Sequence, residues 1–208
     1  MLMILLVLSD LALLGLSRLN KYIHIVAFQG LLLAVFAVVS PDHAITARLL
    51  AIAVTSVALK GIVFPFLLRR VIREAGVQRE VEPFVGYNTS VLCGLAMLGI
   101  SLWLGAKLPP IAGTQLPLLI PAALMTMFTG LFLVVARKKA LTQCIGYIIM
   151  ENGIYAFGLG AVGEIPALVE LGMLLDAFVA VFVMGIAIYH INREFDHIDV
   201  AQLSALKG

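Results

Sequence analysis

Long apolar segments separated by short polar connectors dominate this sequence and leave few folds open to it. A helix needs about 20 apolar residues to cross the hydrocarbon core of a bilayer. Segments that meet or approach this length span residues 1–17, 23–40, 45–68, 84–106, 116–136, 141–163 and 167–191. Hydrophobic residues form 62% of the 208-residue chain and charged residues only 12%, a balance that excludes an ordinary soluble domain. We therefore predict an all-α, polytopic membrane bundle of about seven transmembrane helices.

The basic residues predict how this bundle is oriented. Most of the 14 lysines and arginines lie in alternate connectors and in the tail: Arg18, Lys21, Arg69, Arg70, Arg73, Arg79, Arg137, Lys138, Lys139, Arg193 and Lys207. The positive-inside rule places these connectors in the cytoplasm, so we expect the N-terminus outside and the C-terminus in the cytoplasm. The polar stretch 69–83 could form a short interfacial helix. The net charge of +2 gives no reason to expect a nucleic-acid partner.

The segment 143–160 carries the clearest functional signal. Glu151 and Asn152 lie at its centre, and a carboxylate at that depth costs on the order of 2.5–3.5 kcal/mol on insertion scales. At helical spacing, Cys144, Tyr147 and Tyr155 share a face with Glu151. The two tyrosines could hydrogen-bond to this carboxylate or to water, or could simply pack as aromatic side chains. An intramembrane acid normally faces the bundle interior and marks an ion or proton path.

Three further ionisable residues, Asp10, Lys60 and Asp176, lie deep within predicted spans. The helical rise places Asp176 near the membrane middle, at a depth similar to that of Glu151 on the preceding antiparallel segment. We predict a proton path formed by Glu151, Asp176 and Lys60. Two alternatives stay open for Lys60, namely a structural ion pair and a side chain that snorkels to the interface. Pro65 should bend the helix that follows Lys60.

Other polar residues have weaker functional claims. Possible path-lining residues are Tyr147, Tyr155, Asn152, Glu170, Asp10 and His24. We expect Glu170 nearer the outer surface, and His24 at the inner end of its span, where an interfacial anchor is the simpler interpretation. For Asp10 the structural interpretation is an acid satisfied by a neighbouring subunit or chain. Cys93 and Cys144 lie in apolar segments, so we expect them to pack as small hydrophobic side chains.

Several catalytic motifs are missing from the sequence. It has no Cys-x-x-Cys pair, no phosphate-binding glycine loop, no dinucleotide fingerprint and no plausible Ser-His-Asp arrangement. We therefore expect no catalytic, cofactor-binding or metal-binding site in this chain. Any redox chemistry that drives ion movement would belong to a partner subunit.

Residues 116–208 resemble the K-type subunit of bacterial respiratory complex I and the C-type subunit of Mrp cation/proton antiporters. The matching stretches are 129–131 with the basic loop 137–139, and 145–152. The resemblance implies a proton-path acid on each of two helices. Asp176 matches one of them, and Glu151 stands three residues beyond the other. Three residues are nearly one helical turn, so Glu151 keeps a similar face about 4.5 Å along the axis.

Nearly the whole chain resembles the hydrogenase-4 component E family, membrane subunits of formate hydrogenlyase-like, energy-converting nickel–iron hydrogenases. The resemblance rests on the additional N-terminal spans, on 169–176, and on the tail 194–199 with 206–208. It implies antiporter-like and quinone-subunit-like membrane partners. It also implies a peripheral arm that carries iron–sulfur clusters and the nickel–iron centre. We divide the chain into a four-helix N-terminal extension (1–108), a three-helix complex-I-K-like unit (114–192) and a cytoplasmic tail (193–208).

These observations predict a multi-pass protein of the bacterial cytoplasmic (inner) membrane that is no enzyme on its own. We expect a non-catalytic hydrogenase-complex subunit whose buried carboxylates contribute to a proton or sodium path. The transporter alternative is a subunit of an Mrp-type antiporter, and a further alternative is the K-like subunit of a complex-I-related oxidoreductase. A purely structural clamp is the remaining interpretation. The sequence leaves the choice between H⁺ and Na⁺ open.

Overall fold

The computed structural model describes residues 1–39, 54, 57–75, 83–108, 118–162 and 185, and these residues form no β-strand. The helices are α1 (Leu2–Gly15), α2 (Leu19–Val39), α4 (Phe64–Ala75), α5 (Tyr87–Lys107), α6 (Leu119–Ala136) and α7 (Ala140–Val162). A π-helical turn, η1 (Leu59–Val63), directly precedes α4. The predicted all-α class is therefore confirmed over the described part of the chain. The predicted span 167–191, with Glu170 and Asp176, lies outside the described residues.

Three described helices are long and apolar enough to cross a membrane. They are α2 through its window Leu19–Phe36, the whole of α5 and the whole of α6. Helix α1 is apolar but shorter, and α7 has 23 residues with Glu151 and Asn152 at its centre. A multi-helix membrane protein is thus the fold that these residues support. The number of spans and the orientation of the termini stay predictions.

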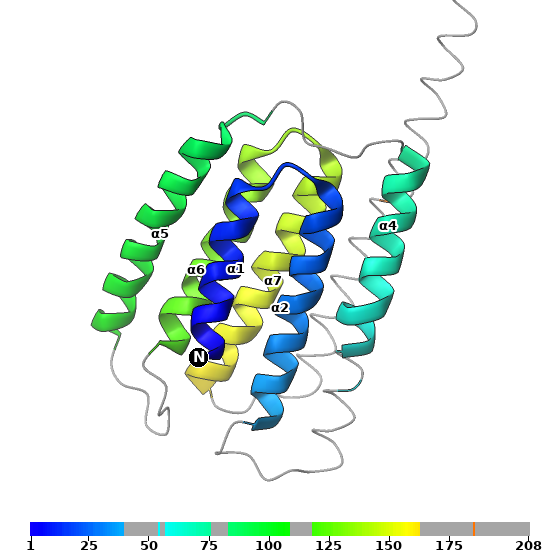
Figure 1. Ribbon diagram of the computed structural model, residues 1–208. Helices are drawn as coiled ribbons and strands as arrows, with labels where there is room; N and C mark the ends of the chain where they lie inside the picture. Colours follow the sequence, from blue (N-terminus) through cyan, green and yellow to red (C-terminus); the bar gives the residue numbers. More distant parts are fainter. Residues whose placement is uncertain (40–53, 55–56, 76–82, 109–117, 163–184, 186–208) are drawn as a thin grey trace, which may run out of the picture.

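Helices α1, α2, α6 and α7 form the centre of the bundle (Figure 1). Helix α5 packs on one side against α1 and α6, and α4 packs on the other side against α2 and η1. The apolar window of α5 is only 17% buried, against 56% for those of α2 and α6. Leu92 and Trp103 are among its exposed side chains. Helix α5 is therefore peripheral, and it turns apolar surface outward as a lipid-facing helix does.

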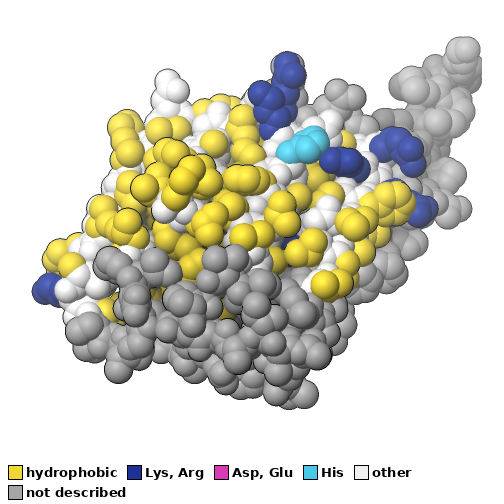
Figure 2. Space-filling model, turned by 60° about the horizontal axis from the view of Figure 1, so that its bottom comes forward, with side chains coloured by type: hydrophobic (Ala, Val, Ile, Leu, Met, Phe, Trp, Pro, Cys, Tyr) yellow, Lys and Arg dark blue, Asp and Glu magenta, His cyan; other side chains and the backbone are white. Residues whose placement is uncertain are grey.

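The molecular surface shows the same division between apolar body and polar edge. Figure 2 shows a broad hydrophobic face, with most of the visible Lys and Arg side chains gathered along one edge of its described part. A contiguous apolar surface of this extent is unusual on a soluble monomer and typical of membrane or subunit contact. Between α1, α5 and α6 this surface is hollowed into a groove of about 240 Å³ lined by apolar side chains, including Leu8, Leu98 and Pro121.

Glycines allow α6 and α7 to approach backbone to backbone. A Cβ atom on Gly146 would lie 2.9 Å from the Gly130 carbonyl oxygen, and one on Gly153 would lie 2.5 Å from the Met127 amide nitrogen. Small residues at such contacts are the usual means by which membrane helices pack closely. Gly130 and Gly146 belong to the stretches that carry the resemblance to the K-type subunit. In this fold both glycines have a packing role.

Arg137, predicted in a cytoplasmic connector, has a structural role that its position in the sequence did not indicate. It is fully buried, and its guanidinium donates from Nη2 to the Leu14 carbonyl oxygen at 3.0 Å and from Nη1 to that of Val85 at 3.1 Å. The guanidinium carbon also lies 4.9 Å from the centre of the Tyr87 ring. Arg137 therefore links the end of α1 and the segment before α5 to the α6–α7 turn. The Leu14 carbonyl is free to accept because the last carbonyls of a helix lack partners within it.

The region around Pro65 shows how the helix continues beyond the apolar segment. Helix α4 runs without a break through Arg69 and Arg73 to Ala75, so the first part of the polar stretch 69–83 is helical, and the predicted span end at residue 68 stays a prediction. The helix continues because Leu68 and Ile72 enter the core while the arginines face outward. The local disturbance predicted for Pro65 is a π turn, in which the Phe64 amide donates to the Leu59 carbonyl oxygen. Proline has no N–H for the ordinary α-helical bond.

Candidate functional site

A set of buried polar side chains lies between two separate hydrophobic clusters. One cluster includes Leu13, Ile23 and Leu133, and the other includes Leu6 and Leu33. On each of α1, α2, α6 and α7, the intervening positions carry buried polar residues. Together with Lys60 of η1 they form what we call the polar layer: Ser9, Asp10, Gln29, Lys60, Thr126, Thr129, Glu151 and Asn152.

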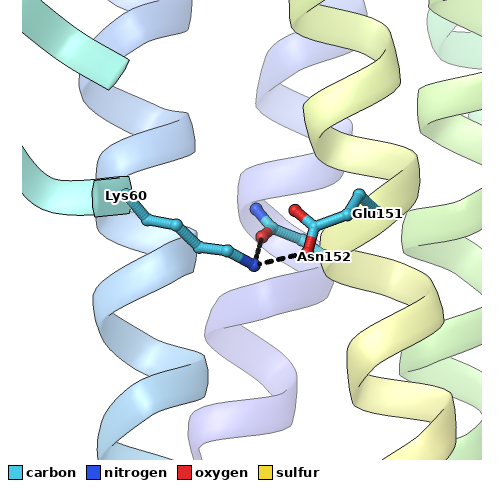
Figure 3. Close-up of polar contacts among 3 residues, drawn as sticks. All are labelled: Lys60, Glu151 and Asn152. Carbon is cyan, nitrogen blue, oxygen red and sulfur yellow. Dashed lines mark hydrogen bonds and ion pairs between the residues drawn. The ribbon is translucent and has the colours of Figure 1, made fainter. Parts of the chain in front are cut away.

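The centre of the polar layer is an ion pair between residues 91 positions apart. Lys60 Nζ lies 3.0 Å from Glu151 Oε1 and donates to Asn152 Oδ1 at 2.8 Å (Figure 3). The two charged side chains are only 3% and 7% exposed. Lys60 therefore points into the bundle, and the alternative in which it snorkels to the interface is wrong. The predicted interior position of Glu151 agrees with its burial.

Gly30 of α2 makes room for the lysine. A Cβ atom at residue 30 would lie 2.8 Å from Lys60 Cβ and 3.3 Å from Lys60 Cδ. The aliphatic stem of Lys60 therefore crosses α2 where that helix has no side chain, and its ammonium reaches α7 beyond (Figure 3). The π turn η1 holds Lys60 at this crossing. Such turns are often found at functional sites.

Two polar atoms beside the ion pair have no hydrogen-bond partner among the described residues. They are Glu151 Oε2 and Asn152 Nδ2. Tyr155 is buried, and its ring centre lies 5.3 Å from Lys60 Nζ, within the range of a cation–π contact. Cys144 is buried and Tyr147 is half-buried. The ammonium is thus held by a carboxylate, an amide and an aromatic face, and one carboxylate oxygen is left to accept a further proton or hydrogen bond.

A second polar group in the same layer surrounds Asp10, which is fully buried. Gln29 Nε2 donates to Asp10 Oδ1 and to Ser9 Oγ, each at 2.8 Å. Thr126 Oγ1 lies 2.8 Å from Asp10 Oδ2 and 2.9 Å from the Ala122 carbonyl oxygen. The expectation that a neighbouring subunit or chain satisfies Asp10 is therefore wrong. Its partners come from α2 and α6 of the same chain, because both of these helices pack directly on α1.

The remaining predicted site residues lie away from the polar layer or outside the described part. His24 is exposed, with Nδ1 2.6 Å from the Asn20 carbonyl oxygen and Nε2 3.0 Å from Arg69 Nη2. This position fits an anchor at the end of α2. Cys93 and Cys144 are free thiols. The described residues contain no group of three or more His, Cys, Asp or Glu side chains that could hold a metal ion.

Sequence reasoning missed five members of the site, namely Ser9, Gln29, Gly30, Thr126 and Thr129. Gln29 carried a detectable signal, since an amide in the middle of an apolar segment requires a partner. Thr126 gave almost none, because a threonine in a membrane helix can satisfy its own hydroxyl on the preceding turn. Gly30 gave no signal, because its role depends on which side chain packs against it in the folded protein.

The chain has a full-length relative. It is 30% identical over 206 residues to the Uncharacterized protein Rv0085 of Mycobacterium tuberculosis, a match that covers 97% of this chain and 92% of that protein. The chain belongs to the family of Rv0085. No protein-family model matches the sequence, and no solved structure matches it significantly.

A second relative matches over about half of the chain. Hydrogenase-4 component E of Escherichia coli K12 is 37% identical over 102 residues, which are 49% of this chain and 46% of that protein. Hydrogenase-4 component E of Shigella flexneri matches with the same figures. The resemblance to this family is thus supported over that part of the Rv0085-type chain. The resemblance to K-type and Mrp C-type subunits stays a prediction.

Proposed function

We propose that this Rv0085-family protein is a non-catalytic membrane subunit of an energy-converting nickel–iron hydrogenase complex of the formate hydrogenlyase type. The similarity to hydrogenase-4 component E supports the hydrogenase context. The observation that carries a role in ion movement is the Lys60–Glu151 pair, buried between two hydrophobic clusters. Buried charges in membrane helices commonly mark ion or proton paths.

Glu151 has a carboxylate oxygen, free among the described residues, at which the pair can take up a proton. Glu151 Oε2 has no described partner, so it is the oxygen at which an arriving proton would bind. Protonation neutralises Glu151, and Asn152 Oδ1 still accepts from the Lys60 ammonium at 2.8 Å. Lys60 therefore remains held while its counter-charge disappears. Asp176 would continue the path on the following segment, and redox chemistry in the peripheral arm would drive the transfer. The transported ion is proposed as H⁺, with Na⁺ as the alternative.

The first test is composition of the complex. The tagged chain is purified in mild detergent from bacterial inner membranes, its partners are identified by mass spectrometry, and nickel and iron are measured. We expect nickel and iron to co-purify with antiporter-like and quinone-subunit-like membrane partners. Recovery of antiporter subunits without nickel would refute the hydrogenase assignment and favour the Mrp-type alternative. Iron–sulfur partners without nickel would favour a complex-I-related oxidoreductase.

The second test separates a path residue from a structural clamp. Glu151→Gln keeps the size and the hydrogen-bonding oxygen of residue 151 but removes its ability to ionise. In sealed membrane vesicles we expect normal assembly and metal content with loss of redox-driven ion uptake. Lys107→Met is the matched control, because Lys107 lies at the end of α5 over the Trp103 ring, 4.5 Å from its centre, away from the polar layer. Unchanged uptake in Glu151→Gln would leave only the structural role.

A further inference from the structure

The hydrogen bonds around Asp10 do not fit an ionised carboxylate well. A hydroxyl group has one proton to donate, yet Thr126 Oγ1 lies within hydrogen-bond distance of two acceptors, Asp10 Oδ2 and the Ala122 carbonyl oxygen. If Thr126 donates to the backbone carbonyl, then its oxygen must accept from Asp10, and only a protonated carboxyl group can donate. The neighbouring Ser9 hydroxyl already bonds in this way: it donates to the Leu6 carbonyl oxygen of its own helix at 2.6 Å and accepts from Gln29.

The charge balance around Asp10 favours the same protonation state. Asp10, Gln29 and Thr126 are each 0% exposed, and the ion pair of Lys60 is made with Glu151. Within the described residues no cation forms a salt bridge with Asp10. A buried carboxylate without a counter-charge is far less stable than the neutral acid. A neutral Asp10 donates from one oxygen to Thr126 and accepts from Gln29 at the other, so both oxygens are satisfied.

Contacts around the polar layer place Asp10 and the ion pair at the same level of the bundle. Asp10 contacts Gln29, whose neighbour Gly30 lies against the stem of Lys60. Lys60 contacts Asn152, and Gly153, the next residue, packs on Met127, which follows the Asp10 partner Thr126. These contacts form a closed ring that contains both Asp10 and Lys60.

Four buried polar atoms of the polar layer have no partner among the described residues. They are Gln29 Oε1, Thr129 Oγ1, Glu151 Oε2 and Asn152 Nδ2. Buried polar groups in proteins are almost always hydrogen-bonded, and ordered water supplies the partner where the protein does not. An acceptor on the Asp10 side and a donor on the Lys60 side are the groups that a bridging water requires.

We propose that Asp10 is a protonated carboxylic acid and a second proton-holding site, joined through buried water in the polar layer to the Lys60–Glu151 pair. Transfer breaks the Asp10 O–H bond and forms an O–H bond on Glu151, with one proton passed along the intervening water. Asp10 becomes the carboxylate and Glu151 becomes the neutral acid. The layer keeps zero net charge throughout, because Lys60 is balanced by Glu151 before the transfer and by Asp10 after it.

The protonation state is testable on the full chain in lipid nanodiscs, without any hydrogenase partner. Infrared spectroscopy detects the carbonyl stretch of a protonated carboxylic acid apart from carboxylate bands. At neutral pH we expect such a band, shifted by ¹³C-aspartate labelling, abolished by Asp10→Asn and retained in Lys107→Met. Absence of an Asp10-dependent band would overturn the proposal. A band that sodium chloride abolishes and choline chloride does not would also overturn it and indicate a sodium site.

The connection between the two sites has its own readout. A neighbouring charge changes the electric field at the Asp10 carbonyl and therefore its vibrational frequency. We expect Lys60→Met to displace the band, because it leaves the Glu151 charge uncompensated. Glu151→Gln should weaken the band, because an uncompensated Lys60 favours the Asp10 carboxylate, while Lys107→Met leaves the band unchanged. A band unchanged by the first two variants would show that the sites do not communicate. Proton exchange during turnover rests on the proposed function, whereas both spectroscopic results stand if nickel and iron fail to co-purify.

Discussion

Replacement of Lys60 and Glu151 by methionine, singly and together, separates what the ion pair contributes to stability from what it contributes to function. Lys60→Met leaves a buried carboxylate without its cation, and Glu151→Met leaves an ammonium held only by Asn152 and the Tyr155 ring. The double variant removes both charges and fills similar volume with apolar atoms. These three proteins form a double-mutant cycle.

The separation of 3.0 Å between Lys60 Nζ and Glu151 Oε1 determines how strongly the two charges attract each other. At an effective dielectric constant near 20, two unit charges at this distance attract by about 5–6 kcal/mol. Desolvation of the two ions opposes most of that gain, so a buried pair adds little relative to apolar residues of equal size. Removal of one partner is a different matter and costs about 3–5 kcal/mol. We therefore expect both single variants to be strongly destabilised and the double variant to recover most of the loss.

The buried thiol of Cys144 provides the assay. In a Cys93→Ala background, a thiol-reactive dye labels Cys144, which is 4% exposed, only when the fold opens. For a chain of this size, 1 kcal/mol shifts the melting temperature by about 2–4 °C. We expect Lys60→Met to lower the melting temperature by about 6–20 °C on that scale. The double variant should melt near the parent protein yet fail to support ion uptake.

Additive single effects would refute this account of the core. If the double variant were as unstable as the sum of the two single variants, Lys60 and Glu151 would not be coupled and the pair would not exist in the folded protein. Restored ion uptake in the stable double variant would instead refute the path role, since neither methionine can carry a proton.

Three further predictions use the same melting assay. Gly146→Ala places a methyl group against the Gly130 carbonyl and the α6 backbone, and should lower the free energy of unfolding by about 1–3 kcal/mol. Gly99→Ala is the control, because nothing lies within 4 Å of a Cβ atom there, and it should cost no stability. An equal loss of stability in both variants would refute the packing role of Gly146. Arg137→Lys cannot span two carbonyl groups and should lose about 1–3 kcal/mol; an unchanged melting temperature would contradict the linking role. Gly30→Ala should displace Lys60 and lower both stability and ion uptake, and normal uptake would show that the stem can cross α2 elsewhere.

Several features of the fold could be predicted from the sequence. Apolar segments of membrane-spanning length predicted the described helices, with a start displaced by a few residues at α2. Helical periodicity placed Glu151 and Tyr155 on one face, and both are buried beside Lys60. Asp10, Lys60 and Glu151 were recognisable as residues in need of partners, because an isolated charge in an apolar helix is costly.

Arg137 shows why exposure could not be read from composition. Its sequence context, a basic run between two apolar segments, is that of an ordinary cytoplasmic connector. Its burial follows from carbonyl groups at Leu14 and Val85, which the bundle brings to one place. Those carbonyls belong to segments far from Arg137 in the chain.

The sequence by itself determined the class of fold and the identity of the residues that must be satisfied inside it. A helical period states which side chains share a face, and transfer energetics state which of them need partners. Only the tertiary structure decided the pairings, namely Lys60 with Glu151 and Asn152, and Asp10 with Gln29 and Thr126. The physical reason is that each pairing depends on which helix faces meet and on where a small residue such as Gly30 lets another side chain pass. These are properties of contacts between segments, and no single segment encodes them.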